Sequence, residues 1–207
     1  MPLKDWQGRQ HEMMTHALDY IANGISVIPL QKNKRPVFEW AEFQKRIASP
    51  EEVQSWWKEW PFAMIGIVTG KISGLAVVDC DSHEAMEVFE RYLPEPAMIP
   101  VVVTPRLGRH YYFRYQDGIY NAAGLHNTKI DIRGEGGYVV APPSVSDTGL
   151  YIWCSCFELI KDIPVQDLTP MPEMFLGPGP SAFPSHSSDN PSNGSLSFEE
   201  GNRDETI

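Results

Sequence analysis

The chain has 207 residues, 42% of them apolar, so it can bury one sizeable core but falls short of two full domains. Its formal net charge of −10 argues against a protein that coats nucleic acid by bulk electrostatics, but not against one that grips it locally. No apolar run approaches the roughly 18 residues of a membrane-spanning helix, and the first residues lack the apolar stretch of a signal peptide. We therefore expect a cytoplasmic protein with no membrane partner.

The first third of the sequence predicts two helices and a strand. Apolar residues at helical spacing predict a helix over about residues 10–23, and the apolar run 26–30 predicts a strand. Ser49, followed by Pro50 and two glutamates, is typical of the start of a second helix. We interpret the tryptophans of that helix as core rather than as a base-stacking platform; they are Trp56, Trp57 and Trp60.

From residue 64 onward the pattern changes to short apolar runs separated by turns rich in glycine, which is typical of strands. A helix capped by Ser82 should follow the second run. We expect three hairpins, which pair 64–69 with 75–79, 99–104 with 110–115, and 130–133 with 138–141. Together these elements predict an α+β or mixed α/β domain built on a largely antiparallel sheet.

The composition shifts after about residue 172. Residues 173–195 are dominated by Pro, Ser, Gly and Asn with little to bury, which predicts a linker. The segment 196–207 becomes amphipathic again, so we expect it to begin a further helical domain of a longer natural protein. The predicted organisation is a catalytic domain over residues 1–172, then the linker, then the start of that next domain.

Two acids close an apolar strand in the segment Leu75-Ala76-Val77-Val78-Asp79-Cys80-Asp81. Because side chains alternate along a strand, Asp79 and Asp81 should project from the same face, where they can share one or two hard cations such as Mg²⁺. An Asp-x-Asp pattern alone also fits a glycosyltransferase that binds nucleotide-sugars, or a solvent-facing turn with no function.

A histidine begins a later strand, directly after a basic turn that contains glycine. His110 can donate a hydrogen bond to phosphate there, with Arg106 and Arg109 supplying positive charge. A surface hairpin with a half-buried histidine has the same pattern, so this signal depends on the acids for its meaning.

A third acid, Asp131, stands two residues before Arg133 on an expected strand, so both should lie on one face. Asp131 can complete a metal site while Arg133 meets a phosphate, and an ordinary exposed ion pair is the alternative. The glycines at 134, 136 and 137 would let the backbone bend sharply or let a substrate approach closely.

Taken in this order, these segments resemble the archaeo-eukaryotic primase superfamily, specifically the bifunctional primase-polymerase domains of plasmids, phages and prophages, over roughly residues 13–159. The resemblance includes a Lys34-Arg35-Pro36 loop near the start. The family's paired acids correspond to Asp79 and Asp81, its small-residue-x-His motif to Gly108-Arg109-His110, and its third acid to Asp131. Where the family commonly has Ser-Gly-Gly before the histidine, this chain has Arg106-Leu107-Gly108, which lacks the small hydroxyl.

The resemblance implies an archaeo-eukaryotic primase catalytic core, with an RRM-like, largely antiparallel sheet, flanking helices and an N-terminal α/β lobe. It implies template-dependent nucleotidyl transfer, as a DNA primase or DNA polymerase, in replication of a plasmid, phage or prophage. Two divalent ions, Mg²⁺ or Mn²⁺, would be held by Asp79, Asp81 and Asp131.

The same resemblance implies the substrates and partners. A dNTP or NTP would meet His110, with Arg133 and Ser144 assisting, and the template would be single-stranded or primed DNA. A C-terminal helicase domain would follow in the full-length protein.

Two other functions fit the same acids. A catalytically weak primase-like fold can serve as a DNA-binding or replication-initiation module, although clustered carboxylates without metal would repel one another and DNA. A metal-dependent nuclease would use the same ions with water as the nucleophile. The glycosyltransferase fits less well, because it leaves His110 and Asp131 unexplained.

Overall fold

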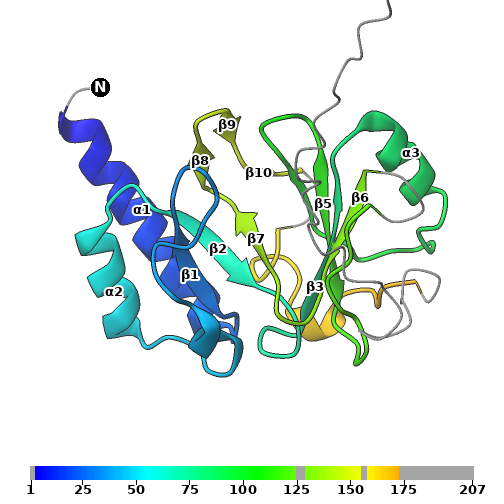
Figure 1. Cartoon of the computed structure of the whole chain (residues 1–207), viewed down its shortest axis with the longest axis horizontal. Helices are drawn as coiled ribbons and strands as arrows, with labels where there is room; N and C mark the ends of the chain where they lie inside the picture. Colours follow the sequence, from blue (N-terminus) through cyan, green and yellow to red (C-terminus); the bar gives the residue numbers. More distant parts are fainter. Residues whose placement is uncertain (1–2, 125–128, 155–157, 173–207) are drawn as a thin grey trace, which may run out of the picture.

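The computed structural model describes residues 3–124, 129–154 and 158–172, which form two lobes joined along one boundary (Figure 1). The linker and the amphipathic segment predicted within 173–207 lie outside the described residues. Among the helices of the described part, none is long and apolar enough to cross a membrane.

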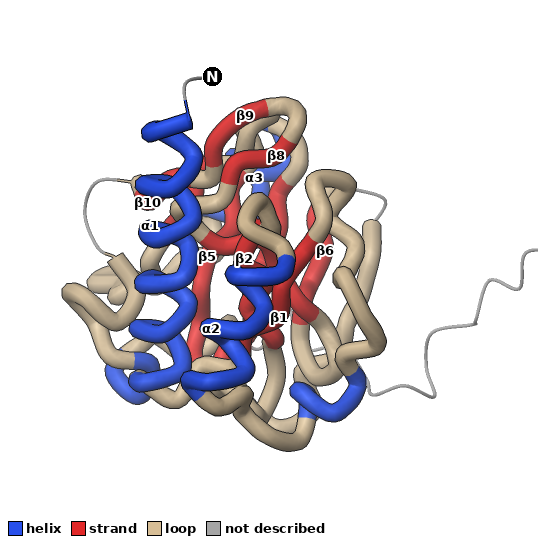
Figure 2. The backbone as a smooth tube through the Cα atoms, turned by 90° about the vertical axis from the view of Figure 1, so that its left-hand side faces the viewer, coloured by secondary structure: helices blue, strands red, loops and turns tan. Residues whose placement is uncertain are grey.

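The first lobe is a three-stranded antiparallel sheet covered by two helices. Its strands run in the order β1 (Val27–Leu30), β2 (Met64–Val68) and β7 (Tyr138–Ala141), so the last strand comes from far along the chain. The helices α1 (Leu3–Ala22) and α2 (Pro50–Glu59) contact each other and lie side by side in Figure 2, and the short helix η1 (Ala41–Gln44) precedes α2.

The predicted start of α2 is confirmed in detail. Ser49 Oγ accepts a hydrogen bond from Glu52 N, and the Glu52 carboxylate accepts one from Ser49 N, which makes a capping box with Pro50 at the first helical position. Trp57 is fully buried and Trp56 is 9% exposed, so both belong to the core. α1, by contrast, begins at Leu3 rather than near residue 10.

The second lobe is a five-stranded antiparallel sheet that packs on α3 (His83–Glu90), which is capped by Ser82 as expected. The strand order across this sheet is β10 (Ile152–Trp153), β4 (Val101–Val103), β5 (Arg109–Arg114), β3 (Leu75–Cys80), β6 (Ile130–Arg133). A separate hairpin joins β8 (Val145–Ser146) and β9 (Gly149–Leu150), and a last short helix, η3 (Val165–Asp167), follows. The antiparallel α+β architecture is therefore confirmed.

The five-stranded sheet separates two apolar cores because its side chains alternate between two faces. Ala76 and Val78 pack with Phe89 of α3, whereas Leu75 and Val77 belong to the core of the first lobe. Asp79 continues the second of these rows. The polar end of β3 is thereby directed toward the first lobe rather than toward α3.

The prediction of two of the three hairpins is wrong. β4 and β5 pair as predicted, but β2 and β3 belong to different sheets, and so do β6 and β7. Each mispredicted turn instead carries the chain from one lobe to the other. The apolar pattern identifies a strand but does not identify its partner, so both crossovers have the sequence appearance of hairpin turns.

The two crossovers pack directly against each other. Gly70 has a φ of +96°, which favours glycine, and a Cβ there would lie 2.8 Å from Glu135 Cα. Thr69 Oγ1 donates to Gly134 O at 2.7 Å, and Thr69 N donates to Gly137 O at 2.9 Å. These contacts join the two lobes at the point where the chain passes between them.

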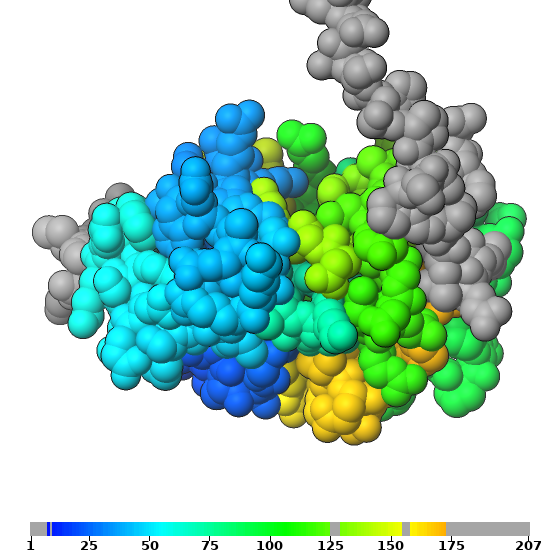
Figure 3. Space-filling view, turned by 60° about the horizontal axis from the view of Figure 1, so that its bottom comes forward, coloured from blue at the N-terminus to red at the C-terminus, as the bar shows by residue number. Residues whose placement is uncertain are grey.

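The last described segment, residues 158–172, also joins the lobes. Leu159 and Ile163 pack in the core of the first lobe, Met171 packs in the core beside α3, and Arg114 N donates to Thr169 O at 3.0 Å. Figure 3 shows this segment, in yellow and orange, between the blue first lobe and the green second lobe.

Candidate active site

Three polar residues lie side by side across the centre of the five-stranded sheet. Asp79 on β3 is directly opposite His110 on β5 and directly opposite Asp131 on β6. Opposite residues on neighbouring strands project from the same face of a sheet. The strand register therefore gathers into one row three residues that are far apart in the sequence.

Asp81 extends this arrangement toward solvent. It follows the end of β3 and is exposed, and its backbone N–H donates to Lys129 O at 3.0 Å, which continues the ladder between β3 and β6. Asp79 and Asp81 both line one cleft between the lobes, as their spacing predicts.

A cleft opens over the row, between the two lobes. It consists of two adjoining cavities of about 350 Å³ and 300 Å³, both lined by Lys34, Asp79, Asp81, His110 and Tyr151. Residues 136–140, Asn121 and Arg133 complete the larger cavity, and residues 104–106, Lys129 and Thr148 complete the smaller one. These volumes suit a small-molecule ligand.

Asp79 is the most buried of the three acids. Its side chain is 15% exposed, and burial, together with the neighbouring charges of Asp81 and Asp131, raises its pKa to about 7. Arg133 and Lys34 act in the opposite direction but do not cancel the effect. Without a further positive charge, the folded protein disfavours the ionised form of this carboxylate.

His110 is buried and uncharged. Burial, with the positive charges of Lys34 and Arg133, lowers its pKa to about 3, so the 3.5 Å approach of His110 Nε2 to Asp79 Oδ1 is not an ion pair at neutral pH. His110 Nδ1 is also buried, and no partner for it is found among the described residues. A neutral imidazole has one N–H donor and one acceptor nitrogen.

In the absence of metal ions, Asp79→Asn should stabilise the folded protein at alkaline pH. The folded-state pKa of about 7 lies above the ordinary value of aspartate, so ionisation of Asp79 costs the folded protein stability. The contribution of Asp79 to the free energy of unfolding is therefore fully present below about pH 4 and lost as the pH rises through 7. The asparagine of the variant cannot ionise, so the variant does not lose this stability. Denaturant unfolding in EDTA should show it gaining on the order of 2 kcal/mol over the wild type between about pH 5 and pH 8.

Asp117→Asn is the matched control, because Asp117 is exposed and does not line the cleft. It should show no such pH-dependent gain. If Asp79→Asn instead loses stability relative to the wild type at pH 8, the carboxylate is favourably paired in the folded state and the argument fails.

Asp131 forms an ion pair with Arg133, which lies on the same face of β6. Its Oδ2 accepts from Arg133 Nη2 at 2.8 Å and its Oδ1 accepts from Gly124 N at 2.9 Å. Asp131 does not line either cavity, and no three Asp, Glu, His or Cys side chains in the described ranges are arranged to hold a metal ion. This is the ion pair that the sequence left open as the alternative for these two residues.

The structure does not bring every candidate to the cleft. Ser144 is buried, and its Oγ accepts from Ile65 N at 2.8 Å, so its nucleotide-binding role stays a prediction without support from the geometry. Arg109 points away from His110 and pairs with Glu90 at 2.5 Å. Of the two arginines in that turn, Arg106 alone lines the cleft.

Among the residues of the cleft that had no role assigned from the sequence are Tyr151, Asn121 and Lys34. Tyr151 is buried with its ring 5.8 Å from the ring of His110, and Asn121 Oδ1 accepts from Gly134 N at 3.0 Å. Lys34 comes from the loop after β1, in the other lobe. Only Lys34 had a signal in the sequence, the Lys34-Arg35-Pro36 loop of the resemblance, because no local pattern marks residues that meet across a tertiary boundary.

The acids of the cleft fit a divalent cation. Asp79 Oδ1 is buried, and no hydrogen-bond partner for it is found in the described part of the chain. A buried carboxylate oxygen without a donor is destabilising, and a hard cation would satisfy it. Asp81 lines the same cavities and supplies further oxygen ligands. These two residues are therefore in place to hold an ion, with Asp131 beside them.

Sequence comparison matches residues 17–174 to the Prim-Pol family, described as bifunctional DNA primase/polymerase, N-terminal. The match covers more than half of the chain and includes all four residues of the row and its extension, Asp79, Asp81, His110 and Asp131. A search of curated proteins gave no match.

Proposed function

Because the chain belongs to the bifunctional DNA primase/polymerase N-terminal family, we propose that it joins nucleotides on a DNA template by nucleotidyl transfer in its interlobe cleft. Family membership implies DNA primase or polymerase activity in general, with a DNA template and nucleotide substrates. The observation that supports the proposed site is the row of Asp131, Asp79 and His110 across three strands, with Asp81 beside it at the cleft.

In this proposal, Asp79 and Asp81 hold divalent ions, and Asp131 joins them once Arg133 releases it. Bound Mg²⁺ or Mn²⁺ would lower the pKa of the attacking 3′-hydroxyl and neutralise charge on the α-phosphate and the leaving pyrophosphate. Arg133, freed from Asp131, becomes available to a phosphate group as a bidentate donor. One ion pair of the structure thus supplies both a ligand and a phosphate contact.

His110 orients the incoming triphosphate. Its ring is fixed by burial, by the β3–β5 ladder and by Tyr151, so its N–H donor has a defined direction. A neutral donor can bind a phosphate oxygen without competing with the ions for the carboxylates. The helicase domain and the replication of a plasmid, phage or prophage remain predictions from the resemblance.

One assay separates this function from its alternatives. The protein is incubated with Mn²⁺, dNTPs and single-stranded DNA that is either primed or unprimed, and the products are resolved by length. Extension of the primer identifies a polymerase, and new products on the unprimed strand identify a primase. Shortened DNA alone identifies a nuclease, and unchanged but bound DNA identifies a binding module; either result contradicts the proposal.

His110→Ala should weaken binding of the incoming nucleotide more than it weakens binding of the template. Loss of a buried hydrogen bond to a charged phosphate should raise the KM for dNTP by about ten-fold or more, while the Kd for single-stranded DNA changes by less than about two-fold. Steady-state kinetics and DNA titrations measure the two quantities. His83→Ala is the control, because the side chain of His83 is 79% exposed on α3. Equal losses for nucleotide and DNA would remove His110 from the nucleotide site.

A further inference from the structure

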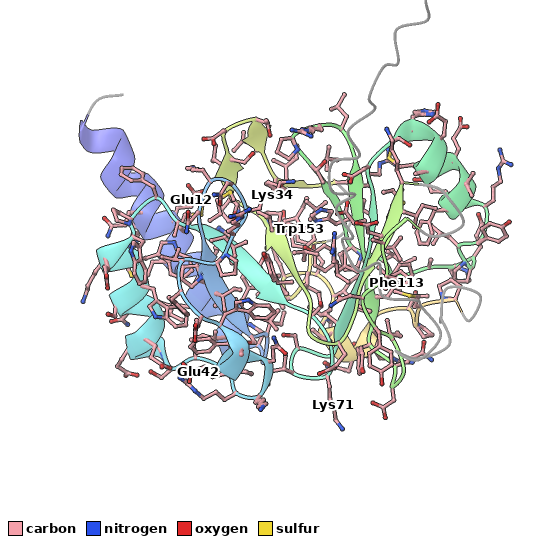
Figure 4. The ribbon with its side chains drawn as sticks, viewed as in Figure 1. Glu12, Lys34, Glu42, Lys71, Phe113 and Trp153 are labelled. Atoms are coloured by element: carbon pink, nitrogen blue, oxygen red, sulfur yellow. The ribbon has the colours of Figure 1, made fainter. Side chains whose placement is uncertain are left out.

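A cation of the first lobe lies over the acids of the second. Lys34 follows β1, and Figure 4 shows it at the tip of that loop, on the side that faces the second lobe. It lines both cavities of the cleft together with Asp79, Asp81, His110 and Tyr151. Lys34 is the member of this shared set that carries an ammonium group.

The backbone holds Lys34 in an unfavourable conformation. Its φ is +71°, in the left-handed region that side chains other than glycine and asparagine rarely adopt. The turn is fixed by Lys34 N donating to Gln31 O at 2.8 Å and Gln31 N donating to Arg35 O at 2.8 Å, and Tyr138 Oη donates to Lys34 O at 3.3 Å. Strain that the surroundings enforce in this way is typical of functional positions.

The charge of Lys34 acts on the site, and no partner that would neutralise it is found among the described residues. It helps lower the pKa of His110 and opposes the rise in the pKa of Asp79, so it lies within electrostatic reach of both. No ion pair or hydrogen bond of Lys34 Nζ is found within the described ranges, although exposed Asp81 lines the same cavities. An unpaired ammonium beside carboxylates that fit divalent ions suits a ligand that carries several negative charges.

We propose that Lys34 binds the phosphate groups of the incoming nucleoside triphosphate, so that nucleotide binding bridges the two lobes. The inference rests on the proposed function and adds a binding residue to the same site. Lys34 shares its cavities with Asp79 and His110, whose side chains are only 15% and 6% exposed on the sheet at the base of the cleft. The phosphate that it meets is therefore one that reaches the sheet, as the reacting triphosphate must, rather than one along an extended DNA backbone.

Two variants make the test specific. Lys34→Asn removes the charge, and asparagine tolerates a positive φ, so the turn should keep its shape. Arg35→Gln is the matched control, because it removes the same charge from the next residue, which is exposed and lines neither cavity. Lys34→Arg keeps the charge and tests whether charge alone is required.

Binding is measured by calorimetry in Mn²⁺ with a non-hydrolysable deoxynucleoside triphosphate, a deoxynucleoside monophosphate and a single-stranded oligonucleotide. Lys34→Asn should lower the affinity for the triphosphate by about ten-fold or more and the affinity for the monophosphate by less. The affinity for the oligonucleotide should fall by less than about two-fold. Arg35→Gln should stay within about two-fold of the wild type for all three. Lys34→Arg should recover most of the lost affinity, and the Tm of Lys34→Asn should equal or exceed that of the wild type.

The possible outcomes distinguish failure of this inference from failure of the proposed function on which it rests. If the wild type incorporates nucleotides but Lys34→Asn binds the triphosphate as Arg35→Gln does, the inference is wrong and the function stands. If the oligonucleotide suffers the largest loss, Lys34 contacts the DNA backbone instead. If Lys34→Asn loses triphosphate affinity but the wild type extends no DNA, the inference stands and the polymerase function fails. A wild type that binds no triphosphate overturns both.

Discussion

Asp79→Asn should lower the rate of nucleotide incorporation by about a thousand-fold or more while leaving the protein folded. The substitution keeps the shape of the side chain but removes the charged oxygens at the centre of the row, and metal-assisted stabilisation of a transition state contributes several kcal/mol. Primer extension measured under single-turnover conditions gives the rate. Because the same variant should be more stable than the wild type without metal, we expect it to remain folded in the assay.

The other two acids extend the test. Asp81→Asn and Asp131→Asn should each abolish incorporation if their carboxylates hold the same ions. Asp131 is the more informative, because it is paired with Arg133 and does not line the cleft in this structure. A wild-type rate in any one of the three variants would remove that residue from the proposed site, and a wild-type rate for Asp131→Asn alone would leave it as a partner of Arg133.

The elements of the fold were predictable from the sequence where the signal is local. The capping box of α2 and the cap of α3 depend on hydrogen bonds within four residues, and the hairpin of β4 and β5 on a short turn. The two failed hairpins depend on which sheet a strand joins. That choice is made by contacts such as Gly70 against Glu135, which are invisible in the pattern of either segment.

The same distinction divides the candidate site. Asp79 and Asp81 share a face by the alternation of one strand, so their proximity was predictable. The row with His110 and Asp131 requires the register of β3 against both neighbours, for which only the family resemblance gave a signal. Lys34 requires the packing of two lobes, so it had no assigned role before the structure.

β3 is the strand on which these relations converge. It lies between β5 and β6, and its inner residues alternate between the core beside α3 and the core of the first lobe. A central strand with both neighbours paired has little freedom to shift, which favours a site whose ligands must keep fixed positions. The cost is that Asp79 is desolvated, and this is the condition in which a bound cation contributes most.

Gly108 explains why a small residue precedes the histidine in this chain. It lies in the turn between β4 and β5, where Gly108 O accepts from Thr104 N at 2.9 Å. A Cβ at Gly108 would lie 2.6 Å from Cys80 O and 3.4 Å from Asp81 Cα. The turn that carries His110 therefore rests on the backbone of the two acids' strand, with no room for a methyl group.

Gly108→Ala should consequently separate the histidine from the acids. The clash is with backbone at the end of β3, which cannot rotate away, so either the turn or Asp81 must move. We expect the free energy of unfolding to fall by about 2 kcal/mol and the rate of nucleotide incorporation to fall by about a hundred-fold, because small misplacements in a catalytic site have large effects on rate.

Gly8→Ala is the control: nothing lies within 4 Å of its Cβ position on α1. That variant should gain about 0.5–1 kcal/mol from helix propensity and keep its activity. Full activity in Gly108→Ala would show that the spacing of the turn from the acids does not matter for the reaction.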